Sequence, residues 1–140
     1  MRPTISIFVL ALCFVTIAVA ADLNIKTEMK TAVDPATTII FALAGEVDPA
    51  NGPDAAKVAT SRWDEALSAS QTLKTAATRL NSAENRRNGA DWIAAAGDFA
   101  RLAEAAGTAA AAKDGAAFSR AANDLGDTCT ACHSNYKTQT

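Results

Sequence analysis

A CxxCH motif lies close to the end of the chain, as Cys129-Thr130-Ala131-Cys132-His133. This spacing is typical of covalent haem attachment, in which two thiols add to the vinyl groups of one haem and the adjacent imidazole binds the iron. On an α-helix, Cys129, Cys132 and His133 would lie at about 0°, −60° and +40° around the axis, so all three can face one ligand. His133 is the only histidine, and Cys13 is the only other cysteine.

Other sites that use these residue types explain the motif less well. A structural zinc site needs four ligands, and the motif supplies two thiolates and one imidazole. A thioredoxin-like CxxC belongs to a βαβ setting, which this sequence does not predict. A disulfide or redox-active thiol pair stays open as the alternative, although neither needs a histidine at the next position. The motif therefore predicts one covalent haem c per chain.

The first 20 residues have the pattern of a secretory signal peptide. A basic residue precedes an apolar run over 5–19, and Ala18-Val19-Ala20 matches the small-residue pattern of a cleavage site. An uncleaved anchor is the alternative, but the run is short for a membrane-spanning helix. We expect cleavage after Ala20, loss of Cys13, and one domain over 21–140 in the bacterial periplasm, without stable membrane insertion.

The charge balance bears on the partner. The full chain has 13 basic and 15 acidic residues, and removing the leader with Arg2 leaves 12 against 15, a net charge of −3. An acidic domain argues against nucleic acid and anionic membranes as partners. We expect a redox partner protein with a basic docking surface, and a homodimer is left open.

Composition predicts an all-α fold. Thirty alanines lie between Asp22 and Thr140, and alanine has the highest helix propensity. Turn residues over 45–52, 81–89 and 113–115 divide this stretch into four expected helices. We expect them to run from about Leu23 to Ala44, from Pro53 to Leu80, from the capping pair Asn88 and Asp91 to Ala112, and from Gly115 to Tyr136.

Each expected helix has apolar residues at spacings of three and four, which predicts one buried face. Pro35 interrupts the first of these faces, so the chain has either one kinked helix or a new helix capped by Asp34. The apolar pattern stays in register across Pro35, which favours one kinked helix. The residues expected to face inward are Ile25, Met29, Ala32, Val33, Ala36, Ile39, Ile40 and Leu43, then Val58, Trp63, Ala66, Leu67, Ser70, Leu73, Ala77 and Leu80, then Ile93, Ala96, Phe99, Ala103 and Ala106, and finally Phe118, Ala122, Leu125, Cys129, Cys132 and Tyr136.

Four helices with short connections predict an antiparallel up-down-up-down four-helix bundle. Cofactors in such bundles lie between facing helices, and the motif cysteines share the inward face of the last helix, so we expect the haem in the core. Each alanine buries little apolar surface. The haem would therefore be the largest apolar body in the domain.

The helix order and the motif together resemble the class II c-type cytochromes, the cytochrome c prime family. That family's motif is CxxCH followed by two residues, a tyrosine and a basic residue, and here the last two are Tyr136 and Lys137. The resemblance covers the mature chain in helix order and only the last helix in motif. It implies thioether bonds at Cys129 and Cys132, proximal iron ligation by His133, and Tyr136 and Lys137 near the haem edge. Many relatives have arginine where Lys137 stands, and lysine lacks its planar fork.

The sixth iron position separates two functions. Met29 is the only methionine after Met1, and it lies on the first helix, which covers the distal haem face in this family. With Met29 on the iron the protein would be an electron carrier and not an enzyme, because His/Met ligation raises the reduction potential. If Met29 only packs in the core, an open site would bind NO or CO. A peroxidase-like enzyme fits less well, since no second histidine could act as a distal acid or base.

Overall fold

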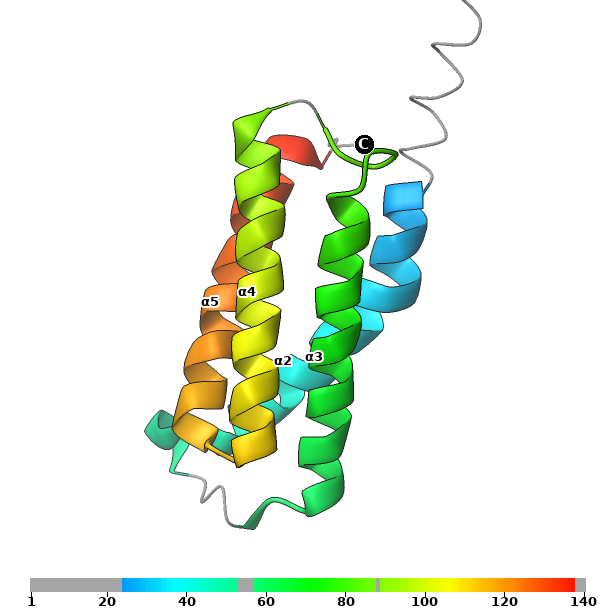
Figure 1. Ribbon diagram of the computed structural model, residues 1–140. Coiled ribbons are helices and arrows are strands. Elements are labelled where there is room, and N and C mark those ends of the chain that lie inside the picture. The colour runs from blue at the N-terminus through cyan, green and yellow to red at the C-terminus, as the bar shows by residue number, and fades with distance from the viewer. Residues whose placement is uncertain (1–23, 53–56, 88, 138–140) are drawn as a thin grey trace, which may run out of the picture.

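The computed structural model describes residues 24–52, 57–87 and 89–137. Four helical stretches pack against one another, as predicted, and consecutive stretches run in opposite directions (Figure 1). The first stretch begins at residue 24 and contains the π-helix η1 (Met29–Val33) and the α-helix α2 (Asp34–Val47), followed by a short 3-10 turn, η2 (Pro49–Asn51). The others are α3 (Thr60–Leu80), α4 (Ala90–Ala112) and α5 (Gly115–Tyr136).

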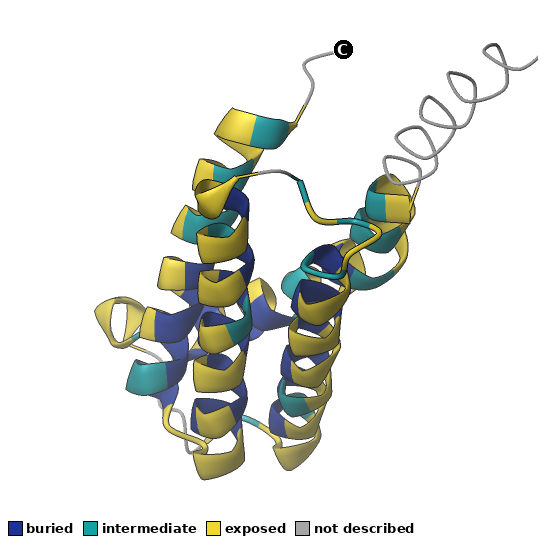
Figure 2. Cartoon of the chain, turned by 45° about the horizontal axis from the view of Figure 1, so that its top comes forward, coloured by how far each residue is buried: buried dark blue, intermediate teal, exposed yellow. Residues whose placement is uncertain are grey.

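The helices form a closed ring of neighbours around one core. α2 packs on α3 and α5, α3 packs on α4, and α4 packs on α5. Buried residues, dark blue in Figure 2, lie along the inner faces of all four helical stretches. Within the described ranges no helix has the length and apolar character needed to span a membrane. The predicted signal peptide lies outside the described residues.

Two predicted helix boundaries are wrong. α3 begins at Thr60 and not at Pro53, because Ala59 has an extended backbone with ψ of 142°. The first helix continues past Ala44 to Val47, whose burial extends it by one turn. Gly89 is the residue directly before α4. Asn88 lies outside the described residues, so its capping pair with Asp91 stays a prediction.

The first helix continues across Pro35, as predicted, but it does not keep an α-helical register there. Pro35 has no amide N–H, and its ring would clash with the carbonyl of Thr31 in a regular α-helix. The chain widens into η1 before this point, and the Asp34 N–H donates to the Met29 carbonyl, five residues back. The wider turn adds one residue, which rotates everything before it by up to about 100° relative to α2. The helix visibly bends at η1 (Figure 1).

Large buried side chains lie at both ends of the bundle, with Trp92 and Leu80 at one end and Trp63 and Phe118 at the end where α3 and α5 begin. The rings of Trp63 and Phe118 meet edge to face, with centroids 5.7 Å apart. Most predicted inward residues are buried or partly buried, with one clear exception. Ile93 was expected in the core but is 44% exposed. Its neighbour Trp92 sets the buried face of α4, because the Trp92 indole N–H donates to the buried Leu80 carbonyl at 3.0 Å.

Two glycines in α4 form a matched pair that tests how closely α3 and α4 pack. A Cβ at Gly107 would lie 3.2 Å from Ser70 Cβ, which cannot rotate away, whereas a Cβ at Gly97 would meet nothing within 4 Å. Gly97→Ala should raise the free energy of unfolding by about 0.5–1 kcal/mol, because alanine loses less backbone entropy in a helix. Gly107→Ala should lower it by about 1 kcal/mol or more through overpacking. Urea denaturation of both variants checks this, and equal gains would contradict the close approach.

Candidate haem-attachment site

The last two turns of α5 position the CxxCH motif. Cys129 and Cys132 are partly buried, both are free thiols, and Cys132 packs against the core. His133, the next residue, is exposed. The Lys137 N–H donates to the His133 carbonyl at 3.1 Å and closes the last turn, and the Lys137 side chain is exposed. Both thiols therefore lie on the inner side of the helix, and the imidazole lies at its solvent-facing border.

The exposure of His133 follows from the bend in the first helix. Gly115, Ser119, Gly126 and His133 lie within about 40° of one another around the axis of α5. The first two are buried and Gly126 is partly buried. α2 covers this flank of α5, since a Cβ at Gly126 would meet the Phe41 ring at 3.9 Å. Beyond the bend, η1 packs on α3 instead. The flank of α5 beside His133 is thus left uncovered.

Met29 and Tyr136, the other two side chains predicted to lie at the haem, have different surroundings. Met29 is the first residue of η1 and is partly buried against the core. Tyr136 is also partly buried, and its ring lies nearly perpendicular to the Trp92 ring, at 84°, with the ring centroids 4.9 Å apart. The sequence did not predict this contact, which joins the motif turn to α4. No spacing pattern could have revealed it, because the two residues are far apart in the chain.

A groove of about 260 Å³ between α4 and α5 runs beside the motif. Asp98 and Ala94 of α4 line one wall, and Thr128 and Ala131 of α5 line the other. The groove reaches Cys132, so solvent and small reagents have a route to this thiol. The route matters for chemistry at the sulfur, because a fully enclosed thiol would be inert.

Burial controls the ionisation of the thiols. Desolvation raises the pKa of Cys129 above the ordinary 9.0, and the nearby Cys132 raises it further. Desolvation also raises the pKa of Cys132. At neutral pH both sulfurs are therefore protonated. A closed metal site is not formed in the described part of the chain, where no three His, Cys, Asp or Glu side chains converge.

The residues present fit a covalently attached haem. Two free thiols share the inner side of one helix, an exposed imidazole follows the second, and the flank beside that imidazole is uncovered. A zinc site would require further ligands. Comparisons with family models, curated proteins and solved structures give no match. The resemblance to class II cytochromes therefore depends on the motif and the helix order.

The thiol environment predicts slow alkylation of the haem-free chain. Because the pKa of each thiol is raised, the midpoint of thiolate formation, and so of alkylation, should lie above the ordinary 9.0. The raised pKa also makes stability depend on pH. The contribution of the protonated thiols to the free energy of unfolding is fully present below the ordinary pKa and is lost as pH rises through the raised pKa. Iodoacetamide labelling against pH, with the chain unfolded in urea as control, checks this. Equal midpoints for folded and unfolded chain would show that the thiols are not desolvated.

Proposed function

We propose that this chain is a periplasmic monohaem c-type cytochrome that carries electrons. The observation that supports this most is the position of the CxxCH motif on the inner side of the last helix of a four-helix fold, with both thiols free and partly buried. Such a position suits a prosthetic group held between helices. The predicted signal peptide supports export to a compartment where haem c is attached.

In this proposal each motif residue has a separate task. Cys129 and Cys132 hold the haem through thioether bonds, and His133 binds the iron on the proximal side. The haem supplies one-electron redox chemistry. The protein supplies a rigid support, because α5 packs along α4 and Tyr136 is held against Trp92. The partly buried apolar residues Ile25, Met29 and Tyr136 would shield the group from water.

The haem would also complete the core. At the end where α3 and α5 begin, large side chains such as Trp63 and Phe118 are fully buried. At the opposite end Trp92 and Leu80 are buried, but Ile25, Met29, Cys132 and Tyr136 are only partly buried. A haem bonded to Cys129 and Cys132 would cover apolar surface at that end, which is favourable by about 25 cal/mol per Å². This is why we propose a class II cytochrome, with the haem in the core of the bundle.

Met29 is the proposed sixth ligand. It is the only thioether after Met1, and it is partly buried against the core at the end of the bundle that carries the motif. His/Met ligation favours electron transfer, since it raises the reduction potential and neither ligand has to leave. The uncovered flank beside His133 favours a second candidate, a five-coordinate haem that binds NO or CO. If the protein is an electron carrier, its acidic surface would dock to a basic surface of the redox partner.

Removing the thiols one at a time tests attachment. Cys129→Ala and Cys132→Ala should each leave one thioether bond, and each should shift the alkaline pyridine haemochrome band to longer wavelength than in the wild type. The double variant should lose all haem on acid-organic extraction, while the wild type keeps it. Haem extracted from the wild type would contradict the cytochrome c assignment.

Replacing Met29 separates the two candidate functions. If Met29 binds the iron, Met29→Ala should convert a low-spin haem to a high-spin or water-bound one, lower the reduction potential and allow ferrous CO binding. A merely packed methionine would cost stability, up to about 2–5 kcal/mol for full burial, without changing ligation. Optical spectra with and without CO distinguish these results. An unchanged spin state would overturn the electron-carrier assignment and favour gas binding. Ile39→Ala, at another partly buried position of the same helix, is the control.

A further inference from the structure

The π-turn in the first helix changes which side chain faces inward before the bend. In an unbroken α-helix, Glu28 would lie about 120° from Ile40, whose side chain is fully buried. The extra residue in η1 rotates the preceding turn about the helix axis. Glu28 therefore points in about the direction that Met29 would have in an unbroken helix. The Glu28 side chain is accordingly only 16% exposed. A carboxylate has been brought to the inner side of the helix, directly before the proposed iron ligand.

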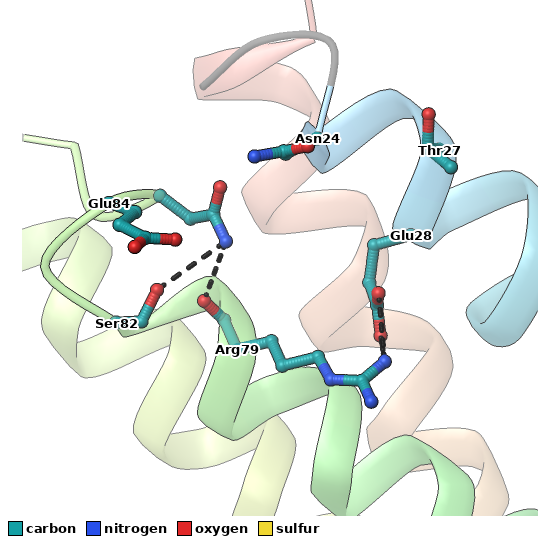
Figure 3. A pocket seen from close by; sticks show the side chains of 7 residues that line it. Asn24, Thr27, Glu28, Arg79, Ser82 and Glu84 are labelled. Atoms are coloured by element: carbon teal, nitrogen blue, oxygen red, sulfur yellow. Dashed lines mark hydrogen bonds and ion pairs between the residues drawn. The ribbon is translucent and has the colours of Figure 1, made fainter. Parts of the chain in front are cut away.

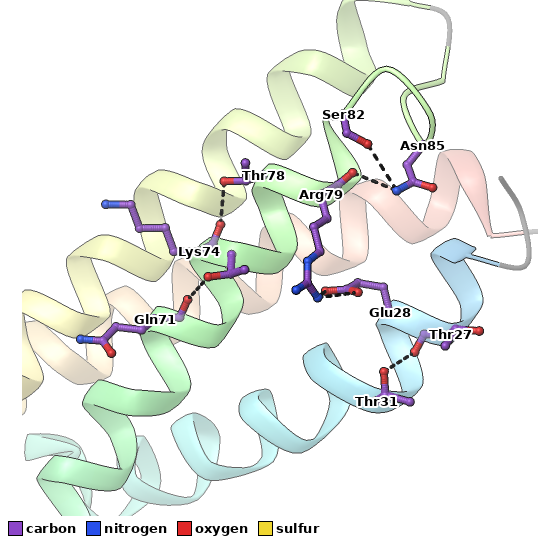
Figure 4. A network of polar contacts seen from close by, with 10 residues as sticks. Thr27, Glu28, Thr31, Gln71, Lys74, Thr78, Arg79, Ser82 and Asn85 are labelled. Carbon is purple, nitrogen blue, oxygen red and sulfur yellow. Dashed lines mark hydrogen bonds and ion pairs between the residues drawn. The ribbon is translucent and has the colours of Figure 1, made fainter.

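This carboxylate has a partner on α3. Arg79 Nη1 donates to Glu28 Oε1 at 3.1 Å and to Oε2 at 3.2 Å, across 51 residues of sequence (Figure 4). The Arg79 carbonyl accepts from Asn85 Nδ2 at 3.0 Å and from the Ser82 N–H at 3.1 Å. These hydrogen bonds from the α3–α4 loop fix the backbone of Arg79 at the end of α3, from which the guanidinium extends.

The surroundings of the pair are polar. A hollow of about 440 Å³ separates the start of the first helix from the α3–α4 loop (Figure 3). Its walls are polar side chains, among them Asn24, Thr27, Ser82 and Asn85. Apolar packing does not close this part of the interface. The ion pair bridges it, as Figure 3 shows.

A chain of contacts then leads from the ion pair to the haem motif. Leu80 follows Arg79, and its carbonyl accepts from the Trp92 indole at 3.0 Å. The Trp92 ring meets Tyr136, one turn after Cys132. The segment that carries Met29 and the turn that carries His133 are thus both anchored to the same end of α3.

We propose that Glu28 and Arg79 are positioning residues for the iron site, because their ion pair holds the Met29 segment against α3 and so decides whether Met29 stays on the iron. This inference rests on the proposed function and deepens it. Neither residue touches the haem in this account. Their role is to keep the π-helical segment from moving relative to the CxxCH turn.

The test uses the haem-loaded, exported protein and two readouts. Glu28→Gln and Arg79→Gln should each raise hydrogen exchange over 24–33 by about two- to fivefold, the range expected for loss of such a pair. Both should also weaken the far-red sulfur-to-iron absorption band and speed ferrous CO binding. High salt should move the wild type in the same direction, because ions screen the pair. The charge swap Glu28→Arg with Arg79→Glu should restore both readouts in part.

Lys74→Gln is the matched control. It removes another cation of α3, whose Nζ lies 3.1 Å from Glu104 Oε1 in an exposed pair with α4, and it should leave both readouts unchanged. Faster exchange with an unaltered band would reduce Glu28 and Arg79 to a structural role and overturn the proposal. Unchanged exchange in both variants would overturn it as well. A wild type without the band would refute Met29 ligation itself, before any variant is compared, and the positioning role would fall with it.

Discussion

Pro35 imposes the constraint on which the arrangement of the helices depends. Proline cannot donate its amide to a carbonyl one turn back, and its ring crowds that carbonyl. The helix accommodates Pro35 through a π-turn over Met29–Val33. Threonine hydroxyls add hydrogen bonds to backbone carbonyls near it; for example, Thr37 Oγ donates to the Val33 carbonyl at 2.9 Å. A bend results, which is the usual consequence of proline and of π-turns in helices. The first helix therefore packs on both α3 and α5 after the bend, and on α3 before it.

This bend divides the bundle into two unlike ends. Where α2 lies against α5, the core is closed around Trp63, Phe118 and Leu43, and small residues let the helices approach closely. Where the first helix has turned away, the thiols, Met29 and Tyr136 are only partly buried. An alanine-rich sequence has few large side chains to add to the buried Trp92 and Leu80 at that end. A haem attached to α5 would supply the missing apolar volume, so the cofactor and the unusual composition have one explanation.

The sequence predicted those features that depend on local patterns. The four helices, the buried faces around Trp63, Leu73 and Phe118, and the inner position of the cysteines follow from helix propensity and from spacings of three and four. Features that depend on contacts between distant residues were missed. Ile93 was assigned to the core because periodicity could not show that Trp92 would orient α4 through Leu80.

The bend in the first helix also depends on features that a sequence pattern does not contain. The sequence identified Pro35 as an interruption, but a strip of apolar residues cannot tell a kink from a π-turn that shifts the register by one residue. The consequence was an inward Glu28 paired with Arg79, and no pattern within the first helix contains its partner. The start of α3 at Thr60 was also missed, because a proline that permits a helix to begin does not require it to begin there.

The mass of the intact protein, exported from a host that attaches haem c, tests the central claim most directly. The account predicts one species with the mass of residues 21–140 plus one haem, unchanged by denaturation in acid. The bare mass of residues 21–140 would contradict it, and a mass lower than that by two hydrogens would show that Cys129 and Cys132 form a disulfide instead.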